Sequence, residues 1–128
     1  MRKQLSMQIS DAESRVMEFL WQHHPATAAQ VHEALGPVHD WREATVKTLL
    51  NRLLGKGAVE VEQDCRRYLY RPAIDRDDWV IEETAGLVDR MFGGRLAPLV
   101  AHFSQHRELS PADIEELRRL IREFDDEY

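Results

Sequence analysis

The stretch that decides the fold runs from Asp40 to Pro72 and reads DWREATVKTLLNRLLGKGAVEVEQDCRRYLYRP. At about 100° per residue, its first part places leucine and valine on one side of a helix and small or polar residues on the other. Gly57 then supplies a stop that is typical of a helix end. Two short segments follow in which apolar and polar residues alternate, as they do in a hairpin. A helix followed by an arginine-bearing hairpin predicts a winged-helix domain that binds DNA.

The predicted helix has two different faces. Val46, Leu49, Leu50 and Leu53 share the side that we expect to be buried, while Ala44 and the polar residues lie opposite. Hydroxyl, amide and guanidinium groups can hydrogen-bond to base edges, and lysine and arginine can bind phosphates. The expected DNA-binding residues are Trp41, Arg42, Thr45, Lys47, Thr48, Asn51, Arg52, Arg66 and Arg67.

Each of these assignments has a plainer alternative. The polar side of the helix would be a solvated surface if it met no DNA. Trp41 is a packing residue that could also contact the DNA backbone, and Arg66 and Arg67 are either phosphate clamps or soluble turn residues at a tip formed by Asp64 to Arg67. The sequence does not divide base-reading from phosphate-binding residues.

Helix starts upstream are marked by capping boxes, in which a Ser, Thr or Asp is followed three residues later by Glu or Gln. The first helix should end before Pro25, and the second should run through Leu35 and stop at Gly36-Pro37. Three short helices within fifty residues predict a helix-turn-helix unit. The boxes are Ser10 with Glu13, Thr27 with Gln30, and Asp40 with Glu43.

Beyond residue 73 the pattern is helical only. Three amphipathic helices of this length bury little surface alone, so a second copy of the chain is the expected partner. We therefore predict a winged-helix DNA-binding domain over residues 1–73 and a helical dimerisation region over residues 74–128. The expected dimer contacts are Trp79, Leu87, Met91, Phe92, Leu99, Val100, Phe103, Ile114, Leu117, Leu120, Ile121 and Phe124.

Composition and charge are compatible with a cytoplasmic protein that binds DNA through its N-terminal part. The net charge is −6, but residues 1–72 hold ten Lys/Arg and nine Asp/Glu, whereas residues 73–128 hold seven and fourteen. Residues 41–71 hold seven basic and four acidic residues, and this local field governs phosphate binding. No membrane span or export signal is expected, and a single cysteine, Cys65, suits the reducing cytoplasm. There is no phosphate loop, nucleophile elbow or zincin motif, so we predict no enzyme activity and no cofactor.

The residues resemble the BlaI/MecI/CopY family of penicillinase, methicillin-resistance and copper-homeostasis repressors. The resemblance rests on SDAE at 10–13, AAQV at 28–31, TVKTLLNRL at 45–53, KG at 56–57 and YLYRP at 68–72, and it continues through FGG at 92–94, LVA at 99–101 and LS at 109–110. It implies a homodimer of winged helices that occludes a palindromic operator, of a β-lactam-resistance or stress-response type. It implies no direct membrane binding by the repressor itself.

In the family, repressors with a membrane-bound sensor protease are inactivated by cleavage, commonly at an Asn-Phe bond. The matching bond here is His102-Phe103. The copper branch carries a C-terminal cysteine cluster that this chain lacks, so copper sensing by thiolates is rejected. His102 and His106 have a metal-binding spacing but no further ligand nearby in sequence, so no metal site is expected. Two alternatives remain: a sensor whose small ligand or metal controls DNA binding, and a winged helix used for protein contact.

Overall fold

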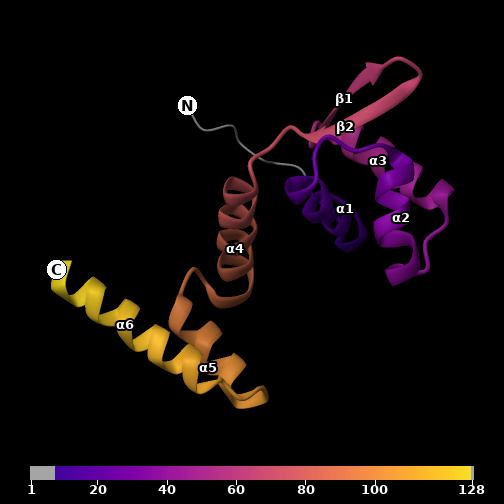
Figure 1. Ribbon diagram of the computed structural model, residues 1–128. Coiled ribbons are helices and arrows are strands. Elements are labelled where there is room, and N and C mark those ends of the chain that lie inside the picture. The colour runs from indigo at the N-terminus through magenta and orange to yellow at the C-terminus, as the bar shows by residue number, and fades with distance from the viewer. Residues whose placement is uncertain (1–7, 128) are drawn as a thin grey trace. The chain divides into compact units, whose positions relative to one another are not determined.

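The computed structural model describes residues 8–127 and divides the chain into two compact units, Met1–Glu82 and Glu83–Tyr128. The expected mainly helical chain with one small β-wing is confirmed (Figure 1). The elements are α1 (Asp11–Gln22), α2 (Ala28–His39), α3 (Glu43–Lys56), β1 (Val59–Asp64), β2 (Arg67–Pro72), α4 (Arg76–Phe92), α5 (Leu96–His106) and α6 (Pro111–Glu127).

Helices α1, α2 and α3 enclose the core of the first unit. Two of the expected capping boxes are confirmed, because Ser10 Oγ accepts from the Glu13 amide and Thr27 Oγ1 accepts from the Gln30 amide, both at 3.1 Å. Burying a valine, leucine or methionine side chain contributes about 1.5–3 kcal/mol to the free energy of folding. The largest fully buried side chains are Met17, Leu20, Leu50, Leu53, Val16, Val31 and Val46.

The expected end of the second helix is wrong. Helix α2 continues through Gly36 and Pro37 to His39. Pro37 lies in the last turn of α2. It has no N–H to donate to the carbonyl of Glu33 four residues earlier, and both residues are exposed, so water can satisfy that carbonyl. Gly36 is buried, and a Cβ atom there would come within 2.7 Å of His32 Cδ2. This glycine therefore serves close packing and does not stop the helix.

The third expected capping box is also wrong. Asp40 ends α2 in the left-handed conformation, with φ 57° and ψ 43°, and its amide donates to Gly36 O. Helix α3 begins at Glu43, and its N-cap is Arg42, which makes no side-chain capping bond. Asp40 cannot act as an N-cap because it reverses the chain between the two helices, a conformation that aspartate tolerates better than most residues.

The wing is an antiparallel hairpin in which Val59 pairs with Pro72 and Asp64 pairs with Arg67. Its loop is therefore Cys65-Arg66 alone, inside the four-residue tip expected from the sequence. The predicted left-handed stop at Gly57 is confirmed at φ 78°.

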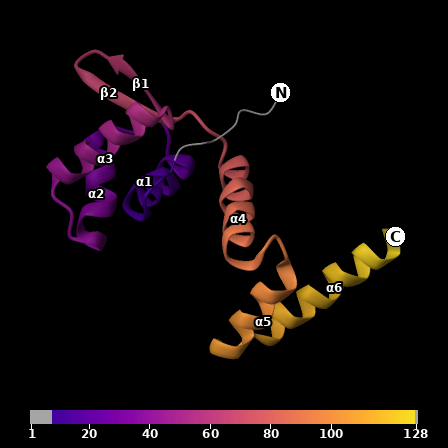
Figure 2. The same ribbon diagram turned by 180° about the vertical axis from the view of Figure 1, so that it is seen from behind.

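The alternation of the hairpin predicted a half-buried stripe, and this holds only at its base. Val59 and Tyr70 are buried, whereas Val61 is 40% and Tyr68 55% exposed. The reason is that the tip projects beyond the helices (Figures 1 and 2). The base is fixed by reciprocal backbone bonds of 3.0 and 2.8 Å between Ala26 and Tyr70, which connect the wing to the turn before α2.

Residues just after the wing also belong to the first unit. Ile74 is buried, and its carbonyl accepts a hydrogen bond of 3.0 Å from Trp21 Nε1. The ring of Trp79 lies 5.5 Å from that of Trp21, and Arg76 pairs with Glu18 at 3.2 Å. Trp21 is therefore a packing residue. Trp79 packs against the core of the first unit of its own chain, and its predicted role as a dimer contact stays a prediction.

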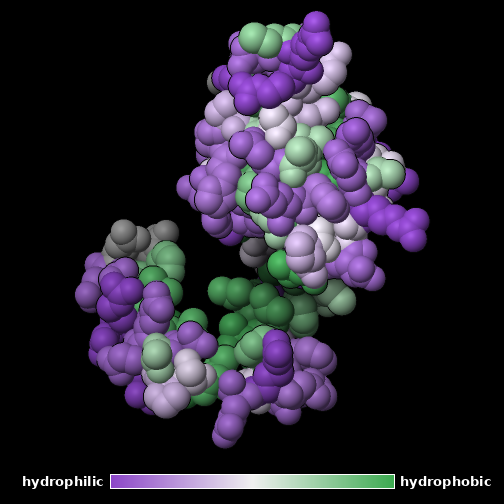
Figure 3. All heavy atoms as spheres, turned by 45° about the vertical axis from the view of Figure 1, so that its right-hand side comes forward, coloured by the Kyte–Doolittle hydropathy of each residue, from purple (hydrophilic) through white to green (hydrophobic). Residues whose placement is uncertain are grey.

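The second unit has no buried core of its own. None of the side chains described in residues 83–126 is buried. Apolar side chains gather on one face of these helices (Figure 3), and Met91 and Phe124 are 68% and 61% exposed. Contiguous exposed apolar surface of this kind marks interaction sites. The dimer contacts proposed from the sequence remain a prediction.

Within residues 8–127, no helix combines the length and apolar character needed to cross a bilayer.

Candidate nucleic-acid interface

Helix α3 has the two faces that its sequence predicts. Val46, Leu50 and Leu53 are fully buried against α1 and α2. The opposite side is open to solvent and carries the assigned polar residues of α3 and its N-cap, whereas Arg66 and Arg67 lie at the wing tip. The exposed residues on it are Arg42, Thr45, Lys47, Thr48, Asn51 and Arg52.

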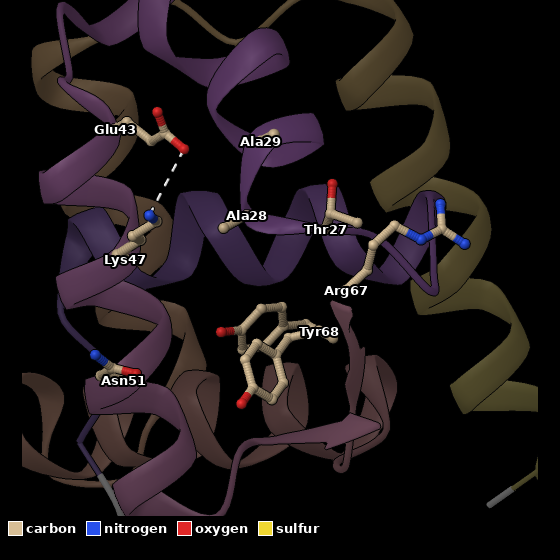
Figure 4. A pocket seen from close by; sticks show the side chains of 9 residues that line it. Thr27, Ala28, Ala29, Glu43, Lys47, Asn51, Arg67 and Tyr68 are labelled. Carbon is tan, nitrogen blue, oxygen red and sulfur yellow. Dashed lines mark ion pairs between the residues drawn. The ribbon is translucent and has the colours of Figure 1, made fainter. Parts of the chain in front are cut away.

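A groove of about 490 Å³ lies between α3, the start of α2 and the wing (Figure 4). It brings Lys47 and Asn51 of α3 together with Arg67 of β2, three residues that the sequence placed in one site. The other predicted contacts do not line it. The groove also contains residues that the sequence analysis did not single out for DNA: Thr27, Ala28, Ala29, Glu43, Tyr68 and Tyr70.

Trp41 is held by packing. Its ring stacks on His39 at 4.6 Å and 27°, and the residue is partly buried against the core. Its carbonyl oxygen lies 3.1 Å from His32 Nε2. This arrangement supports the packing interpretation and fixes the turn that leads into α3. Whether Trp41 also contacts the DNA backbone stays a prediction.

Several cations of the site are paired with acids. Lys47 Nζ lies 3.8 Å from Glu43, and Arg67 lies 2.9 Å from Asp64 at the wing tip. Farther along the hairpin, Arg71 lies 2.8 Å from Glu62. All six side chains are substantially exposed, so each pair is weak and water or phosphate can replace it. Among the predicted DNA-binding residues, all of which the structure describes, the cations without an acidic partner are Arg42, Arg52 and Arg66.

Thr48 is partly committed within its own helix. Its hydroxyl donates to Ala44 O at 3.0 Å. The oxygen keeps lone pairs that can accept from a donor outside the helix. On the exposed face of α3, Thr48 is therefore suited to accept a hydrogen bond, whereas the Asn51 amide can both donate and accept.

A buried ion pair anchors the C-terminal end of α3. Lys56 Nζ donates to both carboxylate oxygens of Glu13 at 2.7 and 2.8 Å, and to Gln8 O at 2.6 Å. Burial by itself raises the pKa of Glu13, but hydrogen bonds from Lys56 and Ser10 outweigh it and leave the pKa below its ordinary value. From the sequence, Glu13 was predicted only as a capping residue; its pair with Lys56 joins positions 43 residues apart.

The structure offers no metal centre in the part of the chain that it describes, because no three His, Cys, Asp or Glu residues are grouped as ligands there. The rings of His102 and His106 on α5 lie 4.7 Å apart, as their spacing predicts. Cys65 is exposed at the wing tip with φ 56°.

Comparison with known proteins agrees with this geometry. The penicillinase repressor family matches residues 9–123. The penicillinase repressor of Bacillus licheniformis is 33% identical over 116 residues, which cover 91% of each chain. The methicillin resistance regulatory protein MecI of Mammaliicoccus sciuri is 29% identical over 114 residues, covering 89% of this chain and 93% of its own.

Solved structures extend the comparison. The solution structure of Bacillus licheniformis BlaI in its monomeric form, in complex with the blaP half-operator, has a TM-score of 0.52 and 36% identity, covering 60% of this chain and 93% of that one. Wild-type MarR of E. coli, with a TM-score of 0.53 and 18% identity over 91% of this chain and 77% of its own, shares the fold alone. The extent of the family match, together with the relative that is 33% identical, shows that this chain belongs to the penicillinase repressor family.

Proposed function

We propose that this protein is a homodimeric transcriptional repressor that binds a palindromic operator through α3 and the wing. The observation that carries the proposal is the groove in which Lys47, Asn51 and Arg67 meet beside an exposed polar helix face. A relative that is 36% identical was solved on a half-operator, which supports the same use of this unit. Repression would follow from steric occlusion of the promoter, in the cytoplasm where the DNA lies.

Dimerisation completes the proposal. A dimer can place two recognition helices in successive major grooves, about 34 Å apart, on a site with dyad symmetry. The exposed apolar residues of the second unit, among them Met91, Phe103 and Phe124, supply surface for a second copy. A signal that separates the copies would halve the DNA contacts and release the operator.

The direct test is binding of the full chain to labelled duplexes. Inverted repeats upstream of its gene are compared with scrambled duplexes of the same composition, by gel shift and by anisotropy at two salt concentrations. We expect tight binding to at least one inverted repeat and sedimentation of the free protein as a dimer. Equal binding to repeat and scrambled duplexes would refute the proposal.

Two variants distinguish residues that contact bases from residues that bind phosphates. Asn51→Ala should lower the preference for operator over random DNA, because an amide can bind a base edge. Arg67→Ala should weaken both alike and flatten the salt dependence by about one unit, as loss of one phosphate contact does. Equal losses for both variants on both duplexes would overturn this division.

Release by proteolysis is a finer proposal that rests on the family resemblance and on relatives named as resistance regulators. The bond concerned, His102-Phe103, lies inside α5, and Phe103 is 41% exposed. The α5 backbone would have to open locally before a protease could bind it in extended form. Incubation with a membrane metalloprotease sensor encoded beside this gene, followed by mass spectrometry of the fragments, would locate the cut. An intact chain would exclude this route of induction by that sensor.

A further inference from the structure

Glu43 is the acidic residue on the recognition face of α3. It is the first residue of the helix, it is exposed, and it lines the groove with Lys47 and Asn51 at successive four-residue steps (Figure 4). These three residues therefore form one stripe along the side of α3 that faces the wing. A duplex seated in this groove would meet the carboxylate as well as the two DNA-binding residues beside it.

The position of Glu43 is electrostatically unusual for a DNA-binding surface. A helix N-terminus attracts anions, and Arg42 places no side-chain cap on the first turn of α3. Without an acid, this turn would favour any phosphate of any duplex. The Glu43 carboxylate opposes that attraction, and at 3.8 Å it also partly neutralises Lys47.

Among the bases, cytosine best matches a carboxylate in the major groove, because the adenine amine stands beside the N7 acceptor. The carboxylate can accept a hydrogen bond from the exocyclic amine of cytosine, whereas the guanine edge presents only acceptors there. The Glu43 carboxylate repels phosphates and guanine and accepts a hydrogen bond from cytosine. It therefore discriminates between sequences partly by weakening binding to wrong sites.

We propose that Glu43 is a specificity-determining residue of DNA recognition. In the free protein its carboxylate holds Lys47. On random DNA it repels the phosphates that would otherwise bind the first turn of α3. On the cognate site it accepts a hydrogen bond from a cytosine amine, which frees Lys47 for the DNA backbone. The inference rests on the proposed function and names a residue that determines its selectivity.

The test compares E43Q with a matched control, D64N, in the full-length protein. Both changes remove one negative charge and release one cation of the same site, Lys47 in the first case and Arg67 in the second. Asp64 lies on the wing and not on the recognition helix. The duplexes are a site recovered from a random pool with the wild-type protein and a random duplex of equal length, and binding is followed by anisotropy.

For E43Q we expect affinity for random DNA to rise about threefold to tenfold, since a repulsive charge within the screening length is lost. Affinity for the selected site should stay constant or fall, so the ratio of the two affinities drops. D64N should raise both affinities by a similar factor and keep the ratio. A second selection performed with E43Q should lose a cytosine preference at one position in each half-site.

Three results would overturn the proposal. An unchanged affinity ratio in E43Q would show that the carboxylate does not discriminate. Equal weakening on both duplexes would assign Glu43 a helix-stabilising role only. Recovery of the same cytosine by E43Q would exclude the base contact. The proposed function fails by a different result, namely failure of the wild-type protein to prefer any selected site over random DNA.

Discussion

Replacing Lys56 with methionine should destabilise the winged-helix unit more than any other single charge deletion described here. The Glu13 side chain is only 3% exposed, and Lys56 supplies hydrogen bonds to both of its oxygens. Removing one partner of a buried ion pair costs about 3–5 kcal/mol, because the other charge remains buried. Lys56 itself is 31% exposed, so water can partly replace it, and we expect a loss near the lower limit, about 3 kcal/mol.

The assay is urea unfolding of the full chain at pH 7 and fixed protein concentration, followed by tryptophan fluorescence, with thermal unfolding in parallel. For a domain of this size the loss should lower Tm by about 15 °C. Lys47→Met is the matched control, because it removes a lysine whose ion pair is exposed, and it should cost under about 1 kcal/mol. A loss in Lys56→Met no larger than that of the control would refute the reasoning.

The pH dependence gives a second, independent readout. Because the folded-state pKa of Glu13 is lowered, its contribution to stability is present above the ordinary glutamate pKa and is lost as pH falls through the folded value. In Lys56→Met, burial is opposed only by the bonds from Ser10, so acidification should penalise the variant less than the wild type. The difference in unfolding free energy between the two proteins should therefore shrink between pH 7 and pH 3, chiefly below the ordinary glutamate pKa of 4.5, where the wild type loses the contribution of Glu13. A constant difference over that range would contradict the assignment of the loss to the Glu13 charge.

Two further predictions follow from backbone conformation and surface burial. Gly57→Ala should destabilise the protein by about 1 kcal/mol, because the residue has φ 78° and the strain is purely conformational. Gly55→Ala, inside α3 with open space around its Cβ, should stabilise the protein by about 0.5–1 kcal/mol; urea unfolding measures both. Equal effects at the two glycines would contradict this. Phe124→Glu should shift the protein from dimer to monomer in sedimentation at micromolar concentration. Val38→Glu is the matched control, because it places the same charge at a 74% exposed site on α2, and it should leave the dimer intact. A dimer that survives the first change would remove that part of α6 from the interface.

The features that the sequence predicted well are those encoded within a few neighbouring residues. Ser10 and Thr27 were identifiable as caps because each bonds to the residue three positions later. The two faces of α3 follow from its helical period alone. The wing was predictable because strand alternation and Gly57 mark its start, and Pro72 marks its end.

The features that the sequence did not predict depend on how the folded chain packs. Gly36 looked like a helix stop, but inside α2 it leaves room for the His32 ring and the Trp41 carbonyl, which a Cβ atom would meet at 2.7 and 3.1 Å. Asp40 resembled an N-cap until the reversal of the chain required its left-handed conformation. The Glu13–Lys56 pair joins the first and third helices, so no local pattern could reveal it.

The charge of the DNA-binding face shows how pairing changes the meaning of composition. Residues 41–71 hold seven basic and four acidic side chains, which as a count suggests an excess of only three positive charges. Two of these acids, Glu43 and Asp64, lie beside the groove cations Lys47 and Arg67, and Glu62 lies beside Arg71 farther along the hairpin. The paired cations reach phosphate only by leaving a weak partner, and the acid that each one leaves then faces the duplex. A site built in this way has a lower affinity for random DNA than its lysines and arginines alone would give. Its affinity is highest where the bases can accommodate the released acids. Selectivity in this protein would therefore arise from its acidic residues as much as from its basic ones.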